Sequence, residues 1–304
     1  MSRKKVILTI APTGGMADKS ASPHLPTQPA EIAADIVRCW QAGASVAAIH
    51  ARRPDGGATC DPSIYREINE RVRERSDIII NNSTGGGISG DMIRGLPDGR
   101  MEIAFEERIK GTQAGAEMCT FDPHMQNLHR GDLELLIDTG WSRCRELAEA
   151  MKEQGIKPEW EIMSLSDLYP VNQLISEGFD DPPHYFNIVL GTHALMTGAT
   201  AYTPTNLQRF VDDLPEDAIF GVSAIGPAQL PASVHCLILG GHARVGLEDN
   251  LYYRRGELAT NLRLVERMVR ILDELEMETA TPAEARQMLG LTPVDAPTRE
   301  GVDV

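Results

Sequence analysis

The sequence predicts an α/β fold, a single (β/α)8 TIM barrel over residues 1–304 with a short C-terminal extension. Eight short apolar runs recur along the chain. Most are apolar at consecutive positions, as parallel strands buried on both faces are. Amphipathic helical patterns fill most of the intervals, and eight such units over about 250 residues are typical of this barrel. A doubly wound sheet is the structural alternative, but no GxGxxG follows the first run.

The elements follow in chain order from these patterns. The predicted strands are Val6–Ala11, Ser45–His50, Asp77–Asn81, Ala116–Phe121, Trp160–Leu165, Tyr185–Leu190, Ala218–Ala224 and Ala243–Leu247. The predicted helices with the clearest apolar stripe are Glu31–Ala42, Ile64–Arg75, Leu133–Gln154 and Leu258–Leu275. Since residues 94–111 are more than one crossover helix needs, we expect an extra loop there.

The extension has its own start signal. Thr281 and Glu284 form a capping box around Pro282, which predicts a short terminal helix Pro282–Met288. The remaining stretch, Thr292–Val304, holds two prolines and few apolar residues, so we expect a loose or partner-covering tail.

Composition narrows the possible partners. A net charge of -15 argues against nucleic acid or an anionic membrane as the main partner. No segment approaches the roughly 18 apolar residues of a membrane span. The five cysteines are scattered, odd in number and without CxxC spacing, which indicates reduced thiols and a cytoplasmic protein.

Charged side chains gather at the ends of two predicted strands. His50 ends the second strand, and the eighth runs from Arg244 into Glu248-Asp249. Loops at the C-terminal ends of parallel strands carry the chemistry of α/β barrels, so these groups predict one polar site. Imidazole plus carboxylate suits Zn²⁺ or a similar divalent ion, and Arg244 can orient Asp249 as a general base. A structural histidine and a structural salt bridge are the simpler alternatives.

Three further strand ends supply polar or flexible residues. Thr13-Gly14 follows the first strand, where glycine permits close approach of a ligand, although a tight turn explains it equally well. Ser83-Thr84-Gly85-Gly86 follows the third strand and offers hydroxyls and backbone N–H groups to an anion. Thr120, near the end of the fourth strand, is a candidate to point into the same site.

These residues lie within segments that resemble the β-keto acid cleavage enzyme family over nearly the whole chain. The matching segments are LPTQPAEIA, AGASVAAIHARRPDGG, NNSTGGG, GGHARVGLEDNLY, RGELATN and TPAEARQMLGL. The resemblance implies a metal-assisted barrel enzyme that takes a β-keto acid and acetyl-CoA and forms acetoacetate and an acyl-CoA. It also implies a homo-oligomer, for which Trp141, Tyr252 and Tyr253 are candidate interface residues; core packing explains them equally well.

The resemblance assigns roles to individual residues. It implies zinc bound by His50 and Glu248, Asp249 as the base with Arg244 beside it, and substrate contacts from Ser83, Thr84 and Thr120. Two departures follow. Ala48 stands where the family has a further histidine ligand, a gap that His242 or water is placed to fill. Met16 falls where an acidic residue is usual, which implies a β-keto acid less polar than 3-keto-5-aminohexanoate.

Two other functions stay open on the sequence alone. A metal-dependent aldolase or hydrolase on the same barrel needs no acetyl-CoA. A non-catalytic barrel that binds a small molecule is favoured by Ala48 and Met16, whereas Arg244, Glu248 and Asp249 count against it.

Overall fold

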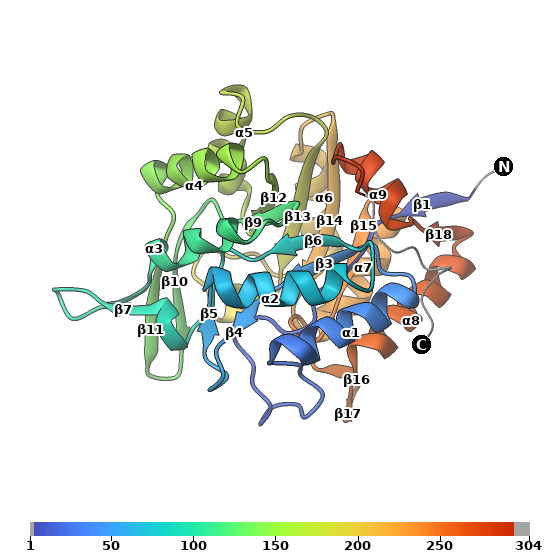
Figure 1. Ribbon diagram of the computed structural model, residues 1–304. Coiled ribbons are helices and arrows are strands. Elements are labelled where there is room, and N and C mark those ends of the chain that lie inside the picture. Colours follow the sequence, from blue (N-terminus) through green and yellow to red (C-terminus); the bar gives the residue numbers. More distant parts are fainter. Residues whose placement is uncertain (1–2, 295–304) are drawn as a thin grey trace.

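A computed structural model describes residues 3–294, and its centre is a closed barrel of eight parallel strands (Figure 1). The barrel strands, in spatial order, are β2 (Leu8–Ile10), β3 (Val46–Ile49), β6 (Ile79–Asn82), β9 (Met118–Phe121), β12 (Lys157–Ile162), β13 (His184–Leu190), β14 (Ala218–Ala224) and β15 (His242–Val245). β15 pairs with β2 and closes the ring. Every predicted strand therefore exists, and the predicted barrel is confirmed.

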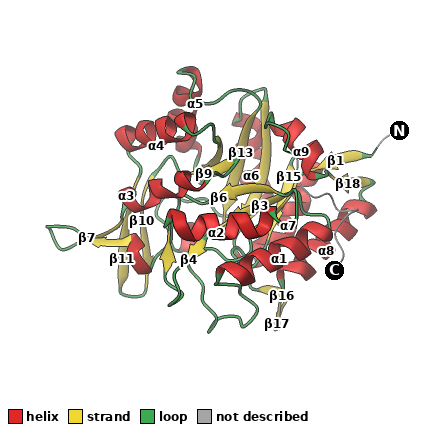
Figure 2. Cartoon of the chain, viewed as in Figure 1, coloured by secondary structure: helices red, strands yellow, loops and turns green. Residues whose placement is uncertain are grey.

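Helices surround the strands (Figure 2). They are α1 (Pro29–Gln41), α2 (Pro62–Arg73), α3 (Phe105–Arg108), α4 (Trp141–Glu153), α5 (Leu168–Ser176), α6 (Pro204–Asp213), α7 (Gln229–Ile238), α8 (Asn261–Glu274) and α9 (Pro282–Leu289). Short 3₁₀ helices are η1 (Gly90–Met92), η2 (Ile109–Ala114), η3 (Leu165–Asp167), η4 (Thr192–Ala194) and η5 (Gly226–Ala228). Each main helix buries one apolar face; in α1 this face includes Ile32, Ile36 and Trp40.

Two predicted segments differ from the structure. The first six residues of the predicted helix Leu133–Gln154 form a strand, β11 (Leu133–Asp138), and α4 begins only after Gly140. The apolar residues of β11 alternate, with Leu135 and Ile137 buried, so the period there is that of a strand. The first predicted strand is divided into β1 (Lys4–Val6) and β2, because β1 leaves the barrel to pair with β18 (Met277–Thr279).

The expected insertion after the third strand is larger than a loop. β7 (Ile93–Gly95) and β8 (Met101–Ile103) form a hairpin, and β8 pairs with β11, which pairs with β10 (Met125–Arg130). The resulting four-stranded sheet unites segments from the third and fourth βα connections. Two small hairpins, β4–β5 (Ala51–Arg52, Ala58–Thr59) and β16–β17 (Tyr252–Arg254, Glu257–Leu258), follow the ends of β3 and β15.

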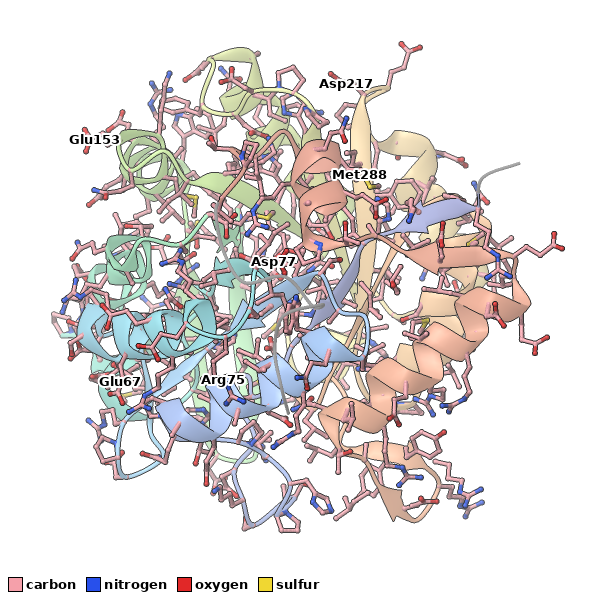
Figure 3. All side chains as sticks on the ribbon, turned by 45° about the vertical axis from the view of Figure 1, so that its right-hand side comes forward. Glu67, Arg75, Asp77, Glu153, Asp217 and Met288 are labelled. Carbon is pink, nitrogen blue, oxygen red and sulfur yellow. The ribbon has the colours of Figure 1, made fainter. Side chains whose placement is uncertain are left out.

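The C-terminal extension covers the end of the barrel at which the strands begin. Leu289 on α9 packs against residues near the starts of barrel strands, such as Ile7 and Ile79. Arg286 donates to Glu117 ahead of β9 and to the carbonyl of Asp77 ahead of β6. Figure 3 brings this side forward and labels Met288 on α9 and Asp77. The capping box of Thr281 with Glu284 is present, so the predicted terminal helix is confirmed.

The predicted tail lies outside the described residues from position 295 onward. All five cysteines are buried free thiols. Within residues 3–294 no helix combines the length and the apolar character needed to cross a bilayer.

Candidate active site

The turn after β15 brings two adjacent carboxylates onto one arginine. Arg244 lies on β15, and the carbonyl of Gly246 accepts hydrogen bonds from the backbone N–H groups of Asp249 and Asn250. This tight turn reverses the chain, so that Glu248 and Asp249 do not point to opposite faces as neighbours on a strand do. Arg244 donates to Asp249 through Nε and Nη2, both at 3.0 Å, and to Glu248 Oε1 at 2.6 Å.

The histidine of the second barrel strand lies against this arrangement. Nε2 of His50 is 3.4 Å from Oε1 of Glu248, and Nδ1 is 2.8 Å from the carbonyl oxygen of Gly86. Because a carbonyl oxygen only accepts, the Nδ1 hydrogen bond places a proton on Nδ1 and turns Nε2 toward Glu248. Gly14 makes room for that carboxylate: its φ is +65°, and a Cβ there would lie 2.6 Å from Cγ of Glu248.

Four carboxyl groups interact with the guanidinium of Arg244, of which Glu159 and Asp249 are buried and Glu161 and Glu248 are slightly exposed. Burial acts to raise the pKa of Glu248, but its interactions with Arg244 and His50 outweigh burial and hold the pKa at about 2. Burial raises the pKa of Asp249 and of Glu159, with Arg244 opposing the shift in both. Glu248 is therefore the most firmly ionised member, and Asp249 binds a proton more readily than an ordinary aspartate does.

Glu161, the fourth carboxyl group, lies 3.6 Å from Nη1 of Arg244 and accepts a hydrogen bond from Nδ2 of Asn187. Burial raises the pKa of Glu161 well above its usual range, and the neighbouring carboxylate of Asp122 raises it further. Two carboxyl groups this close share one proton more readily than both ionise. Glu161 is accordingly the member of the pair that binds a proton more readily, whereas His124 and Arg108 lower the pKa of Asp122 despite its burial.

Sequence reasoning missed three cavity residues: Glu161, Asp122 and His124. Glu159 and Glu161 are two positions apart in a buried strand, so both point to the barrel interior, and that spacing was the available signal. Asp122 and His124 follow the fourth barrel strand, where side chains reach the mouth. Nδ1 of His124 is buried and has no hydrogen-bond partner among residues 3–294.

Several predicted substrate-binding residues line the same cavity. Ser83, Gly85 and Gly86 lie on its wall, and Gly15 and Met16, on the loop after β2, line it beside them. These two loops touch through backbone alone, since a Cβ on Gly15 would collide with Gly86 and Gly87. Close packing of the loops therefore accounts for their glycines, and it leaves the backbone of the Ser83–Gly87 loop facing the cavity.

The structure does not bring the three predicted threonines into the cavity. Oγ1 of Thr13 donates to the carbonyl of Pro26. Thr84 and Thr120 bond each other: Oγ1 of Thr84 donates to the Thr120 carbonyl, and Oγ1 of Thr120 accepts from the Thr84 backbone N–H. All three side chains are buried and committed to internal hydrogen bonds. Their physical role here is to fix the loops, and we omit them from the proposed substrate contacts.

His242 was the suggested substitute for the missing metal ligand, and this suggestion is wrong. It begins β15, at the opposite end of the barrel from Glu248, and its Nδ1 accepts a hydrogen bond from the backbone N–H of Ile7. Ala48 lies on β3 two positions before His50, on the same side of the strand. Among residues 3–294 no group of three or more His, Cys, Asp or Glu side chains is placed to hold a metal ion.

The wall facing the charged groups is largely apolar. The four-stranded sheet contributes Ile103, Leu128 and Ile137, one from each of three strands. The remaining apolar lining residues are Met16, Ile88, Met163, Val189, Met196 and Ile225. The cavity thus has one strongly polar end, at Arg244, and one end that suits a hydrocarbon group.

The chain is similar to known proteins over nearly its whole length. A family model described as beta-keto acid cleavage enzyme matches residues 5–291. The chain is 34% identical to the 3-keto-5-aminohexanoate cleavage enzyme of Fusobacterium nucleatum, over 95% of this chain and 98% of that protein. It is 33% identical to the 3-dehydrocarnitine:acetyl-CoA trimethylamine transferase of Rhizobium meliloti, over 95% and 97%. The 3-oxoadipate:acetyl-CoA acetyltransferase of Cupriavidus necator is 28% identical over 94% of each chain.

The fold is also found among solved structures. The apo structure of ObcA superposes with a TM-score of 0.71 at 18% identity, covering 89% of this chain and 66% of that chain. At this identity the likeness concerns the fold, whereas the family model and the curated relatives match nearly the entire sequence. The chain therefore belongs to the family of β-keto acid cleavage enzymes.

Proposed function

We propose that this protein transfers the carboxymethyl part of a β-keto acid to the acetyl group of acetyl-CoA, giving acetoacetate and an acyl-CoA. Membership of the family supports a β-keto acid as substrate, and two relatives are named for transfers with acetyl-CoA. The observation that carries the proposal is the carboxylate of Asp249, which Arg244 holds through two hydrogen bonds at the edge of the cavity.

Asp249 is the proposed general base. The hydrogen atoms on C2 of a β-keto acid are acidic, because the resulting carbanion is delocalised into the ketone. Burial raises the pKa of Asp249 toward the range in which a carboxylate accepts protons effectively. In the proposed first step Asp249 removes a proton from C2, and C2 then attacks the thioester carbonyl of acetyl-CoA and expels CoA thiolate.

The second half of the proposed reaction releases both products and returns Asp249 to its ionised form. CoA thiolate attacks the former ketone carbon, the bond between C2 and C3 breaks, and the acyl part leaves as acyl-CoA. The enolate of acetoacetate takes the proton back from Asp249. No oxidant, reductant or net proton is consumed. Arg244 acts as a positioning residue for Asp249, because both nitrogen atoms that bond Asp249 belong to one rigid guanidinium.

His50 and Glu248 form the proposed site for a divalent cation such as Zn²⁺. When Nε2 of His50 carries no proton, it presents a lone pair to the carboxylate of Glu248. Oε2 of Glu248 is buried without a hydrogen-bond partner among residues 3–294. Two such acceptors repel each other unless a proton or a cation lies between them. A cation bound there would polarise the ketone of the substrate. Because catalytic zinc has three protein ligands and Ala48 supplies none, we expect weak binding.

The apolar end of the cavity is the proposed site for the acyl part of the substrate. Met16 and the three residues from the four-stranded sheet offer no partner to an ammonium group. Burying a charged amine against them would cost free energy of desolvation that no interaction there offsets. We therefore propose an alkyl β-keto acid, such as 3-oxohexanoate, in preference to 3-keto-5-aminohexanoate.

A product analysis tests the proposal. Purified protein is incubated with 3-oxohexanoate, with and without acetyl-CoA, and acetoacetate and butyryl-CoA are measured together. Formation of both products in equal amounts, only with acetyl-CoA, is the expected result. Cleavage that does not need acetyl-CoA would instead identify an aldolase or hydrolase. Binding of β-keto acids without any turnover would instead indicate a non-catalytic barrel that binds small molecules.

A further inference from the structure

A second hollow lies beside the catalytic cavity, between α7, α8 and the loops that follow β14 and β15. It measures about 960 Å³ and is mainly apolar, with Pro227, Leu230, Pro231, Leu251 and Tyr252 in its walls. Ile225 and Asp249 line both this groove and the catalytic cavity. A long molecule in the groove would therefore reach the carboxylate of Asp249 with one end.

The outer end of the groove is rich in arginine. Residues 251–270 include five arginines and two glutamates, in a chain whose net charge is -15. Arg254 and Arg255 are at the turn of the β16–β17 hairpin, and Arg267 on α8 donates to the carbonyl of Tyr253 in the same hairpin. All three arginines line the groove. This concentration of positive charge next to an apolar wall is chemically matched to a phosphorylated nucleotide.

Tyr253 holds part of this positive surface in place. The guanidinium carbons of Arg263 and Arg267 lie 4.1 and 4.5 Å from the centre of its ring, and Arg270 donates to its hydroxyl. Arg254 is paired with Glu257. Arg255, in contrast, makes no hydrogen bond or ion pair with any of residues 3–294, so its charge is available to a ligand.

The place of the groove in the barrel supports an anionic ligand. β14 and β15 are the seventh and eighth barrel strands, and loops after these two strands frequently form the phosphate-binding site of TIM-barrel enzymes. We propose that this groove binds the nucleotide half of acetyl-CoA, with Arg255 at its phosphates, Tyr252 beside its adenine and the pantetheine arm passing Ile225 to Asp249. This inference rests on the proposed function, because it assumes acetyl-CoA as the co-substrate.

The experiment compares acetyl-CoA with acetyl-pantetheine, which carries the same thioester without the nucleotide. In Arg255→Ala we expect the KM for acetyl-CoA to rise about tenfold, equivalent to about 1.4 kcal/mol of binding. The KM for acetyl-pantetheine should stay unchanged, because that substrate has no phosphate group for Arg255 to bind. The matched control is Arg75→Ala, an exposed arginine after α2 that Figure 3 labels, with no side-chain partner among residues 3–294.

Direct binding separates this inference from the proposed function. Calorimetry with adenosine 3′,5′-bisphosphate should give saturable binding to the wild type and to Arg75→Ala, and weaker binding to Arg255→Ala. That result supports the groove even if no β-keto acid is turned over. An unchanged KM for acetyl-CoA with equal bisphosphate binding in all three proteins would overturn the proposal. So would a loss of subunit association in Arg255→Ala without a kinetic change, since the groove would then be an interface between copies of the chain.

Discussion

Nε2 of His50 lies 3.4 Å from Oε1 of Glu248, although the two residues are far apart in the sequence. The closed barrel brings them together, because β15 and β3 are both neighbours of β2. This contact joins a candidate cation site to the carboxylate pair on Arg244.

Replacing Asp249 should abolish the proposed proton transfer while the fold survives. For Asp249→Asn we expect kcat to fall by roughly 10²- to 10⁴-fold, the usual contribution of a general base. The matched control is Glu161→Gln, since the raised pKa of Glu161 favours its protonated form, which glutamine resembles. Steady-state kinetics of both variants decide the point; equal losses in the two would reject Asp249 as the base.

The rate of the same reaction should decrease on the acidic side of the pH profile. Because burial raises the pKa of Asp249, activity should fall as the pH drops through a value above the ordinary aspartate range. Above that value the carboxylate is ionised and able to accept the proton. A kcat profile of the wild type from neutral to acidic pH measures this limb, and a profile that stays flat down to pH 4 would speak against the assignment.

Ala48→His should restore a third donor to the proposed cation site. Position 48 shares the inward side of β3 with His50, and three protein ligands are usual for catalytic zinc. We expect zinc affinity to rise by roughly 10- to 100-fold, the scale of single interactions at metal sites. Competition with a chromophoric chelator measures the affinity, and His50→Ala in the same background should reverse the gain. No gain in zinc affinity would show that zinc is not bound at this site.

Met16→Glu should shift the substrate preference toward an amino-bearing β-keto acid. Met16 lines the cavity, and a carboxylate there would pair with an ammonium group that the native wall leaves unpaired. We expect the ratio of kcat/KM for 3-keto-5-aminohexanoate over 3-oxohexanoate to rise by roughly tenfold. Met16→Gln, which has similar size without charge, is the control, and an equal shift in both variants would contradict the electrostatic explanation.

His242 should make the protein less stable as the pH falls. Burial lowers the pKa of His242 to about 3, with Lys4 adding to the effect. Between that value and the ordinary value of about 6.5, the unfolded chain binds a proton that the folded chain does not. The free energy of unfolding is therefore highest when the pH is above the ordinary histidine pKa. It decreases at lower pH, by about 2 kcal/mol at pH 5.

The measurement is urea unfolding at pH 7 and pH 5. His242→Asn keeps an acceptor for the backbone N–H of Ile7 but does not titrate, so it should lose about 2 kcal/mol less between the two pH values than the wild type does. His129→Asn, at an exposed position, should behave as the wild type. Identical pH dependence in all three proteins would show that His242 is not the responsible group.

The sequence by itself determined the barrel and the ends of its strands. Consecutive apolar runs marked all eight barrel strands, and the order of polar residues after them placed His50, Arg244, Glu248 and Asp249 at one mouth. The family resemblance is confirmed over residues 5–291. A homo-oligomer and a cytoplasmic location stay predictions, as does the assignment of one domain to the whole chain.

The tertiary structure decided which of those residues face the cavity. His242 and Arg244 are only two positions apart, a step of about 7 Å along a strand, yet the register of β15 puts His242 at the closed end and Arg244 near the mouth. The threonines and Ser83 all hydrogen-bond to nearby backbone groups, yet only Ser83 lines the cavity. The apolar wall depends on pairing between β8 and β11, which are distant in sequence. Such long-range pairing leaves no local pattern, because each segment acquires its partner only when the chain has folded.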